Sequence, residues 1–221
     1  MALDFVKPLD RLLAAQAGPV TLVTLGPLTS LALALRREPE LVRQKVTRHV
    51  AMLGSVAGPG NTTAYSEFNA WCDPEAADAV LRAELPTELV GLNVTRRVLV
   101  SGAEIERLGH APADGAHWLH DALRFYLEFH RSHEGLDACV VNDVLPIAAL
   151  LRTEVLAFQP RRLAVELEPG ERRGQTRVDP EGARVRVATA VRPQPVRALL
   201  MERVLPWLGQ GAGAGAEVAA R

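Results

Sequence analysis

Short apolar runs alternate with helix-type segments, and this alternation constrains the fold more than any other feature of the chain. Residues 20–25 (VTLVTL) form a continuous apolar run with a Gly-Pro pair on each side, the pattern of a strand buried on both faces. Helix-type segments lie at 9–17, 28–37 and 39–48, and a second apolar run lies at 49–53. This order predicts an α/β fold with an open, mostly parallel, Rossmann-like sheet and helices on both faces.

The alternation continues toward the carboxyl end. Asp73-Pro74-Glu75 is a helix start, because a carboxylate N-cap precedes a proline at the first helical position and a second acid. That helix is expected to run to about Glu84. The remaining expected elements are a strand at 87–92, helices at 103–108, 115–133 and 143–151, antiparallel or edge strands at 162–167 and 183–189, and a helix at 196–208.

The ends of the chain carry two further expectations. The pattern opens on a helix rather than on a strand. The continuous apolar run at 20–25 is typical of an interior strand, which pairs with another strand on each of its two edges. We therefore expect a chain truncated at its amino end. Residues 1–208 are expected to form a single domain, and residues 209–221 a Gly/Ala-rich, disordered tail.

Composition excludes several classes of partner. The 25 Lys and Arg residues nearly balance the 26 Asp and Glu residues, giving a formal net charge of -1, so a broad positive surface for nucleic acid is absent. No apolar run approaches the roughly 18 residues of a membrane span, and Asp4 and Lys7 interrupt the start where a signal peptide needs apolar residues. Two cysteines, Cys72 and Cys139, are too few for a disulfide framework. We expect a soluble, cytoplasmic protein.

The densest polar cluster is residues 61–69 (NTTAYSEFN), which follow the second apolar run. Loops at the carboxyl ends of parallel strands are where open α/β sheets bind ligands. Asn61, Glu67 and Asn69 offer donors and acceptors that match the vicinal hydroxyls of a sugar. A solvated turn without a binding role is the alternative that composition leaves open.

A second candidate is Asn142-Asp143, at the start of the helix expected over 143–151. An aspartate at that position is either a helix N-cap or a ligand of a hard cation such as calcium. One aspartate cannot make a calcium site by itself, because the ion takes about six to eight oxygen ligands.

His117 and His120 form one i, i+3 pair, and His130 and His133 form a second. This spacing puts the two histidines of each pair on one face of a helix, where they could bind zinc. No Cys, His and Glu set completes the geometry, so we reject zinc. The chain also lacks a P-loop, a GxGxxG after a strand and a GxSxG elbow.

Seven segments, taken together and in order, carry a family resemblance. They are VTLGPLTSLALAL at 23–35, MLGSV at 52–56, PGN at 59–61, SEFN at 66–69, DPEAA at 73–77, VGLNVT at 90–95 and Asn142-Asp143. The chain resembles the inosine–uridine-preferring nucleoside hydrolases, and the match runs from about residue 5 to about residue 205. The resemblance implies an enzyme that cleaves the N-glycosidic bond of purine or pyrimidine ribonucleosides in nucleoside salvage. In that family, a calcium ion held by aspartates activates a water that attacks the anomeric carbon.

The resemblance also implies roles for single residues. It implies Asn61, Glu67 and Asn69 as ribose-hydroxyl ligands, with Met52 lining the sugar site and Phe68 and Tyr126 among the substrate-binding side chains. It implies Asp143 and the backbone carbonyl of Leu25 as calcium ligands. Leu25 stands where the family usually has threonine, which matters little if only the backbone oxygen binds.

Two departures from the family bear on activity. The family's amino-terminal Asp-x-Asp-x-x-x-Asp-Asp cluster, which supplies the general base and most calcium ligands, has no counterpart here. The match begins after roughly two or three βα units of about 30 residues each. Asn142 occupies the position of the family histidine that is associated with leaving-group protonation, and asparagine cannot act as an acid. His130, one helical turn after Tyr126, is a hypothetical replacement for that acid.

We therefore interpret the sequence as a ribonucleoside hydrolase whose present form is incomplete, inactive or dependent on a partner. The partner would be an amino-terminal segment with the missing aspartates or another copy of the chain. One alternative is a ribose- or nucleoside-binding remnant without catalysis, and the other is an unrelated Rossmann-like binding domain. We expect Asn61, Glu67, Asn69 and Asp143 to converge on one pocket.

Overall fold

The computed structural model describes residues 8–110 and 114–203, which form two compact units. Unit 1 combines the segment up to Thr95 with Leu145–Val191, and unit 2 combines Arg96–Val144 with the segment that begins at Arg192. Each unit has its own sheet. Whether they act together as the single domain expected over 1–208 stays a prediction.

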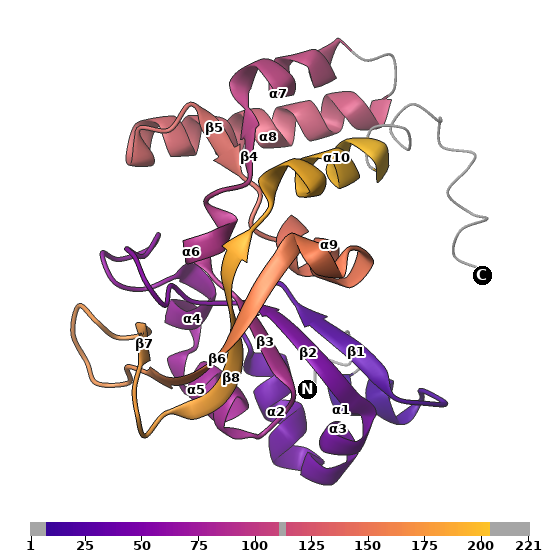
Figure 1. The fold of residues 1–221 in the computed structure, drawn as a ribbon, viewed down its shortest axis with the longest axis vertical. Coiled ribbons are helices and arrows are strands. Elements are labelled where there is room, and N and C mark those ends of the chain that lie inside the picture. Colours follow the sequence, from indigo (N-terminus) through magenta and orange to yellow (C-terminus); the bar gives the residue numbers. More distant parts are fainter. Residues whose placement is uncertain (1–7, 111–113, 204–221) are drawn as a thin grey trace, which may run out of the picture. The chain divides into compact units, whose positions relative to one another are not determined.

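The sheet of unit 1 has six strands in the order β1-β2-β3-β8-β6-β7 (Figure 1). β1, β2, β3 and β8 are mutually parallel, whereas β6 is antiparallel to both of its neighbours. This is the mostly parallel α/β sheet that the sequence predicts. The strands are β1 (Val20–Thr24), β2 (Val46–Met52), β3 (Thr87–Val90), β6 (Leu156–Val165), β7 (Thr176–Val178) and β8 (Ala183–Val191).

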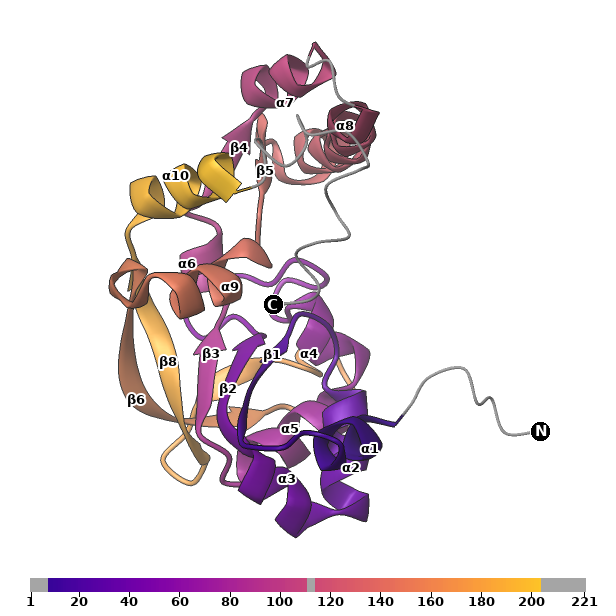
Figure 2. The ribbon, with the colours of Figure 1, turned by 90° about the vertical axis from the view of Figure 1, so that its right-hand side faces the viewer.

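Helices cover both faces of this sheet. Leu31 of α2 and Val80 of α5 share one apolar core with Ala51, Leu89 and Val187 of the strands. α9 lies on the opposite face (Figure 2). The helices of unit 1 are α1 (Leu9–Ala14), α2 (Thr29–Arg37), α3 (Pro39–Lys45), α4 (Phe68–Cys72), α5 (Pro74–Arg82), α6 (Leu92–Thr95) and α9 (Val144–Leu151), with a 3-10 turn at Thr153–Val155.

Unit 2 is a helical layer on a two-stranded antiparallel sheet. β4 (Leu99–Ser101) pairs with β5 (Ala138–Val140), and the helices are α7 (Gly102–Gly109), α8 (Asp114–Glu134) and α10 (Pro193–Arg203). A capping box starts α7, because the Ser101 hydroxyl accepts from the Glu104 N–H while the Glu104 carboxylate accepts from the Ser101 N–H.

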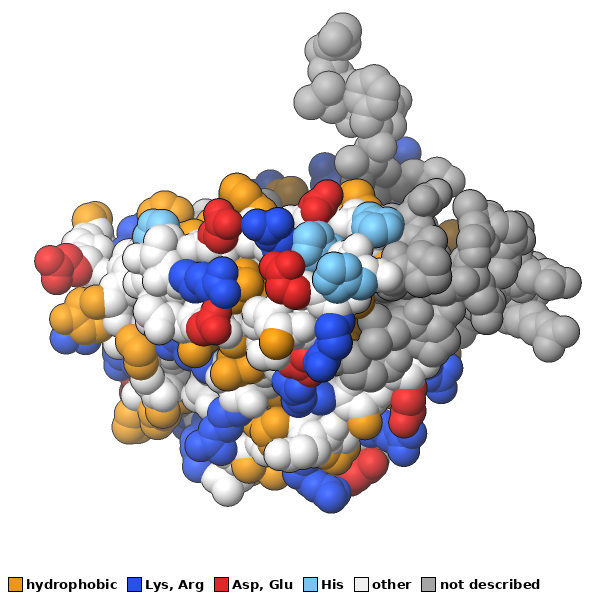
Figure 3. Space-filling view, turned by 90° about the horizontal axis from the view of Figure 1, so that it is seen from above, with side chains coloured by type: hydrophobic (Ala, Val, Ile, Leu, Met, Phe, Trp, Pro, Cys, Tyr) orange, Lys and Arg blue, Asp and Glu red, His pale blue; other side chains and the backbone are white. Residues whose placement is uncertain are grey.

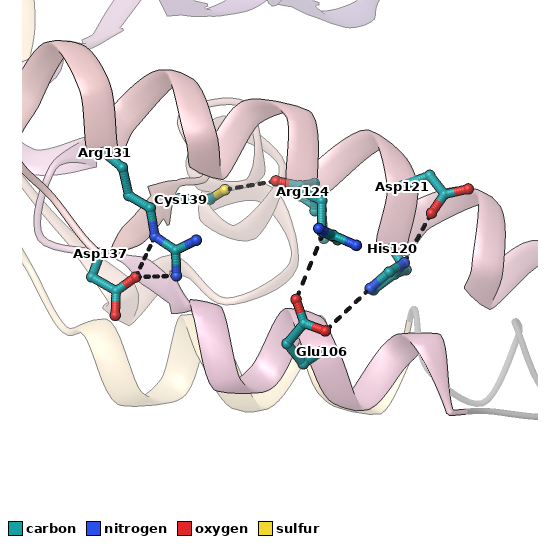
Figure 4. Close-up of polar contacts among 8 residues, drawn as sticks. Glu106, His120, Asp121, Arg124, Arg131, Asp137 and Cys139 are labelled. Atoms are coloured by element: carbon teal, nitrogen blue, oxygen red, sulfur yellow. Dashed lines mark hydrogen bonds and ion pairs between the residues drawn. The ribbon is translucent and has the colours of Figure 1, made fainter.

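Charged side chains join α7 to α8 and α8 to the loop before β5 (Figure 4). Glu106 lies 3.7 Å from His120 and 3.8 Å from Arg124, and Arg131 pairs with Asp137 at 2.6 Å. Seen from above, histidine side chains gather among arginines and acids (Figure 3). These surface pairs contribute little stability each, so unit 2 depends mainly on the apolar cluster around Ile105, Leu127 and Cys139.

Several expected boundaries were wrong. Residues 46–48 belong to β2 rather than to the preceding helix, because Val46 pairs with Val20 of β1. The first helix ends at Ala14 rather than at residue 17. The strand expected at 162–167 begins at Leu156, since β6 pairs along nearly the whole of β8.

Other expectations were confirmed or lie beyond the described residues. Asp73 caps α5 by accepting from the Ala76 N–H at 3.0 Å. The two late strands are antiparallel to each other, but β8 is an interior strand that also pairs with β3. The expected helix at 196–208 begins at Pro193; its end and the expected tail at 209–221 lie outside the described residues. In residues 8–110 and 114–203, no helix is long and apolar enough to cross a membrane.

One histidine is sealed inside the sheet of unit 1. His49 of β2 is fully buried; its Nε2 lies 2.9 Å from the Thr24 hydroxyl of β1, and its Nδ1 lies 3.1 Å from the Thr87 hydroxyl of β3. Burial lowers the pKa of His49 from 6.5 to about 4. The imidazole is therefore neutral in the folded chain at neutral pH and links three strands through two hydroxyls.

We expect this histidine to make the fold acid-sensitive. Below pH 6.5 His49 becomes protonated in the unfolded chain, whereas in the folded chain it stays neutral down to about pH 4. Stability is therefore lost as the pH falls through this window, by about 2 kcal/mol at pH 5. Urea unfolding at pH 7 and pH 5 measures the loss. His49→Gln keeps a donor and an acceptor but does not titrate, so between pH 7 and pH 5 its free energy of unfolding should fall by about 2 kcal/mol less than that of the native protein. Equal losses of unfolding free energy in both proteins would contradict the prediction.

Candidate functional site

The segment that follows β2, residues 53–69, is called the polar loop here, and the carboxylate of Glu67 organises it. This side chain is only 2 % exposed and accepts hydrogen bonds from the N–H groups of Gly54, Asn69 and Ala70 at 2.8, 2.8 and 3.1 Å. Two of these bonds cap the first turn of α4, and the third holds the chain where it leaves β2. One buried charge thus ties the start of the loop to its end.

Asn69 connects this loop to the ends of two neighbouring strands. Its Nδ2 donates to the backbone oxygen of Met52 at 3.0 Å and lies 3.4 Å from the backbone oxygen of Leu25 and 3.3 Å from the Met52 sulfur. Leu25 follows β1 and Met52 ends β2. The structure thus brings together three residues that the sequence assigns to the sugar and metal sites.

Asn61 and Phe68 complete the group in unit 1. The Asn61 Oδ1 accepts from the Phe68 N–H at 2.9 Å, while the Phe68 ring is half exposed. Within the described part of the chain, the Asn61 Nδ2 and the Asn69 Oδ1 have no protein partner. The loop therefore keeps one amide donor and one amide acceptor for the hydroxyls of a ligand.

A distant segment holds the loop from outside. The Thr176 hydroxyl accepts from the Ser55 N–H at 2.9 Å, and the Ser66 hydroxyl donates to the Arg173 carbonyl at 2.7 Å. Gly174 lies so close to α4 that a Cβ there would come within 2.7 Å of the Trp71 Cα. Sequence reasoning missed Arg173, Gly174 and Thr176, since nothing local marks a contact across more than 100 residues of chain.

The remaining candidate side chains belong to unit 2. His130 is buried, its Nδ1 donates to the Tyr126 carbonyl at 2.8 Å, and its ring meets the Tyr126 ring edge-on at 4.3 Å. Burial raises the pKa of Tyr126. Asn142 and Asp143 lie in the turn between β5 and α9, and partial desolvation raises the pKa of the Asp143 carboxyl. Convergence of Asp143 with Glu67 stays a prediction, because the two belong to different units.

The donor set for a metal ion is small. In the described ranges, no three His, Cys, Asp or Glu side chains gather closely enough to hold a metal. His120 pairs with Glu106 and with Asp121 at 2.9 Å instead (Figure 4). The two calcium ligands expected from the sequence are one carboxylate, Asp143, and one backbone carbonyl, that of Leu25, and they belong to different units. Calcium therefore does not fit the described residues of either unit alone, because the ion takes about six to eight oxygen ligands.

Comparisons with known proteins agree on one family. The sequence pattern described as "Inosine-uridine preferring nucleoside hydrolase" matches residues 2–198. A pyrimidine-specific ribonucleoside hydrolase RihA from an Enterobacter species is 37 % identical over 175 residues, which cover 79 % of this chain and 55 % of that protein. RihA from Shewanella woodyi is 36 % identical over 165 residues, 74 % of this chain and 52 % of that protein.

Solved structures give the same result. A plant nucleoside hydrolase superposes with a TM-score of 0.83 at 28 % identity, covering 92 % of this chain and 68 % of that one. A purine-preferring ribonucleoside hydrolase from Gardnerella vaginalis superposes with a TM-score of 0.82 at 25 % identity, covering 91 % and 65 %. The chain spans about half the length of the curated relatives it matches. It belongs to the inosine-uridine preferring nucleoside hydrolase family.

Proposed function

We propose that the protein acts in hydrolysis of the N-glycosidic bond of ribonucleosides and that this chain supplies the ribose-binding part of the site. The observation that carries the proposal is the Asn69 amide, which lies within hydrogen-bonding distance of carbonyls from the ends of two adjacent parallel strands. Ligands of open α/β sheets bind at such strand ends. The family match supports the reaction class.

In this proposal each polar side chain of the loop has a separate task. The Asn69 Oδ1 accepts from one ribose hydroxyl, and the Asn61 Nδ2 donates to another. Met52 packs against the sugar, and Phe68 and Tyr126 border the substrate. Glu67 binds a hydroxyl and also fixes α4, because three backbone N–H groups already converge on its carboxylate.

The calcium chemistry of the family needs more oxygen ligands than the described residues supply. When bound, the ion would activate the attacking water. Asp143 and the Leu25 carbonyl are the two ligands that we propose from this chain, and the other carboxylates would come from outside residues 1–221. We therefore propose that the chain alone is inactive. We also propose that the protein works in nucleoside salvage in the cytoplasm; the free thiols of Cys72 and Cys139 suit a reducing compartment.

A second candidate function is nucleoside binding without catalysis. Its specific support is that Glu67, the carboxylate beside the two amides, already accepts hydrogen bonds from three backbone N–H groups, which makes it a weak general base. General-base activation typically contributes about 10²–10⁴-fold in rate. The two candidates differ in one respect only, namely whether a source of carboxylates restores turnover.

We expect the isolated chain to show no calcium-dependent turnover. Purified residues 1–221 are incubated with uridine and with inosine, with and without calcium, and base release is followed by chromatography while the metal is titrated by calorimetry. The expected result is no release and no tight calcium binding. Adding the aspartate-bearing amino-terminal segment of a relative should restore release if the protein is an enzyme. Calcium-dependent cleavage by the chain alone would contradict our assignment of the catalytic carboxylates.

We expect Glu67→Gln to destabilise unit 1 far more than a matched surface change. A glutamine presents an N–H group where the native carboxylate accepts bonds, so at least one buried backbone donor loses its partner, at a cost of about 2–4 kcal/mol. Glu75→Gln is the control, since Glu75 is exposed and pairs at the surface with Arg173; it should cost under about 1 kcal/mol. Urea unfolding measures both, and equal losses would show that the Glu67 cap carries no special weight.

We expect His130 to protonate the leaving base in a form of the enzyme that carries the aspartate cluster. The His130 Nδ1 is occupied by a carbonyl, so the Nε2 is the atom that would deliver the proton. His130→Ala should slow cleavage of uridine or inosine by about 10²-fold or more, and slow an activated aryl riboside little. His133→Ala is the control, because His133 makes the same bond to its own helix at 3.1 Å but is exposed. Equal losses on both substrates would refute the role.

A further inference from the structure

A cavity lies in unit 1, away from the polar loop. Its volume is about 620 Å³, and it is bordered by residues near the amino ends of β2, β3 and β8 and by the end of α9. The polar loop follows the opposite, carboxyl ends of the strands. A cavity of this size is within the range of sites for small organic ligands, and the proposed hydrolase function makes no use of it.

One wall of the cavity is a charged ladder across three strands. Glu88 of β3 is buried, and its Oε2 accepts from the Nε and Nη2 of Arg48 at 3.0 and 2.7 Å. Its Oε1 accepts from the Nη1 of Arg186 on β8. The carboxylate fixes both guanidinium groups, and each keeps N–H donors that Glu88 does not use.

A third arginine makes the cavity strongly positive. Arg184 borders the same cavity, and its guanidinium group forms no hydrogen bond or ion pair within the described part of the chain. The cavity is lined by three arginines and one acid, Glu88, so its formal charge is +2. An anion is therefore the ligand class that this wall favours, because guanidinium groups bind carboxylate and phosphate oxygens through paired N–H groups.

The rest of the lining is apolar and includes a flat ring. The Arg186 guanidinium lies 5.3 Å from the centre of the Phe158 ring. Leu85, Leu156 and Val185 also border the cavity. Inorganic phosphate would fill only a small part of this volume, so the ligand needs an apolar, planar body that packs against Phe158 beside its anionic group.

We propose that this cavity binds the phosphate monoester of a planar ring, with the phosphate on Arg48, Arg184 and Arg186 and the ring against Phe158. A dianionic phosphate matches the formal charge of +2, which a single carboxylate does not. The shared chemistry covers simple aryl phosphates and nucleoside monophosphates. The alternative is a solvated ion-pair ladder that binds nothing.

Calorimetric titration of residues 1–221 with four probes tests the proposal. Phenyl phosphate carries both groups, phenol only the ring and inorganic phosphate only the anion, so phenyl phosphate should bind at least tenfold more tightly than either. Uridine monophosphate distinguishes the two sources, because preference for it over phenyl phosphate indicates a nucleotide site. Binding should weaken as salt is raised from 50 to roughly 300 mM, since the attraction is ionic.

Variants locate the binding. Arg184→Ala should weaken phenyl phosphate binding at least tenfold without changing the melting temperature, because Arg184 supports no other described residue. Phe158→Leu should weaken the binding of phenyl phosphate but not the binding of inorganic phosphate. Arg43→Ala removes a surface arginine of α3 and should change the affinity for neither of these ligands. Absent binding of phenyl phosphate at millimolar concentration, or equal affinities in the Arg184→Ala and Arg43→Ala proteins, would overturn the proposal in favour of the ion-pair ladder. Asn69→Ala, which alters the polar loop, should leave phenyl phosphate binding intact.

Discussion

The carboxylate of Glu67 is the interaction on which the organisation of the polar loop depends. An ionised group with 2 % exposure is stable only when hydrogen bonds replace its hydration, and here three backbone N–H groups do so. Those same bonds place Gly54 and start α4, which in turn presents Asn69 to the ends of β1 and β2. A residue that resemblance alone would treat as a ribose ligand is also the structural support of its neighbours.

Glu67 and His49, two buried titratable side chains of unit 1, are stabilised in opposite ways. Glu67 is surrounded by donors, which suits a negative charge. His49 has only two hydroxyl partners, so it is stable in the sheet as a neutral imidazole and its pKa falls to about 4. The Glu88 ladder is a third solution, in which arginines compensate a buried acid at the rim of a cavity. Each group is therefore charged or neutral according to the donors and charges that the strands place beside it.

Local patterns predicted most elements of the fold, because each has a signal within a few residues. The apolar run of β1 and the Asp73-Pro74 helix start are examples, and both elements are present. The expected burial of β1 on both faces was wrong, because β1 lies at the edge of the described sheet and its residues are partly exposed. Boundaries failed where tertiary pairing overrides local preference: Val46 continues a helix-type pattern but pairs with β1. Within the site, the cluster at 61–69 was found from its polarity and by resemblance, whereas Thr176 and Gly174 were not. Their contacts with Ser55 and Trp71 bridge segments that lie far apart in the chain, and no periodicity encodes such a contact.

The contacts that Arg173, Gly174 and Thr176 make with the polar loop and α4 have a consequence for the order of folding. β1, β2 and β3 are consecutive along the chain, and their pairing requires only moderate loop closures. The hydrogen bond between Ser55 and Thr176 joins residues that are 121 positions apart in the chain, so forming it closes a long loop. The entropy lost in closing this loop is compensated only when β8 and β6 have paired with the sheet. The polar loop therefore takes its final shape late, when most of the sheet that carries it has already formed.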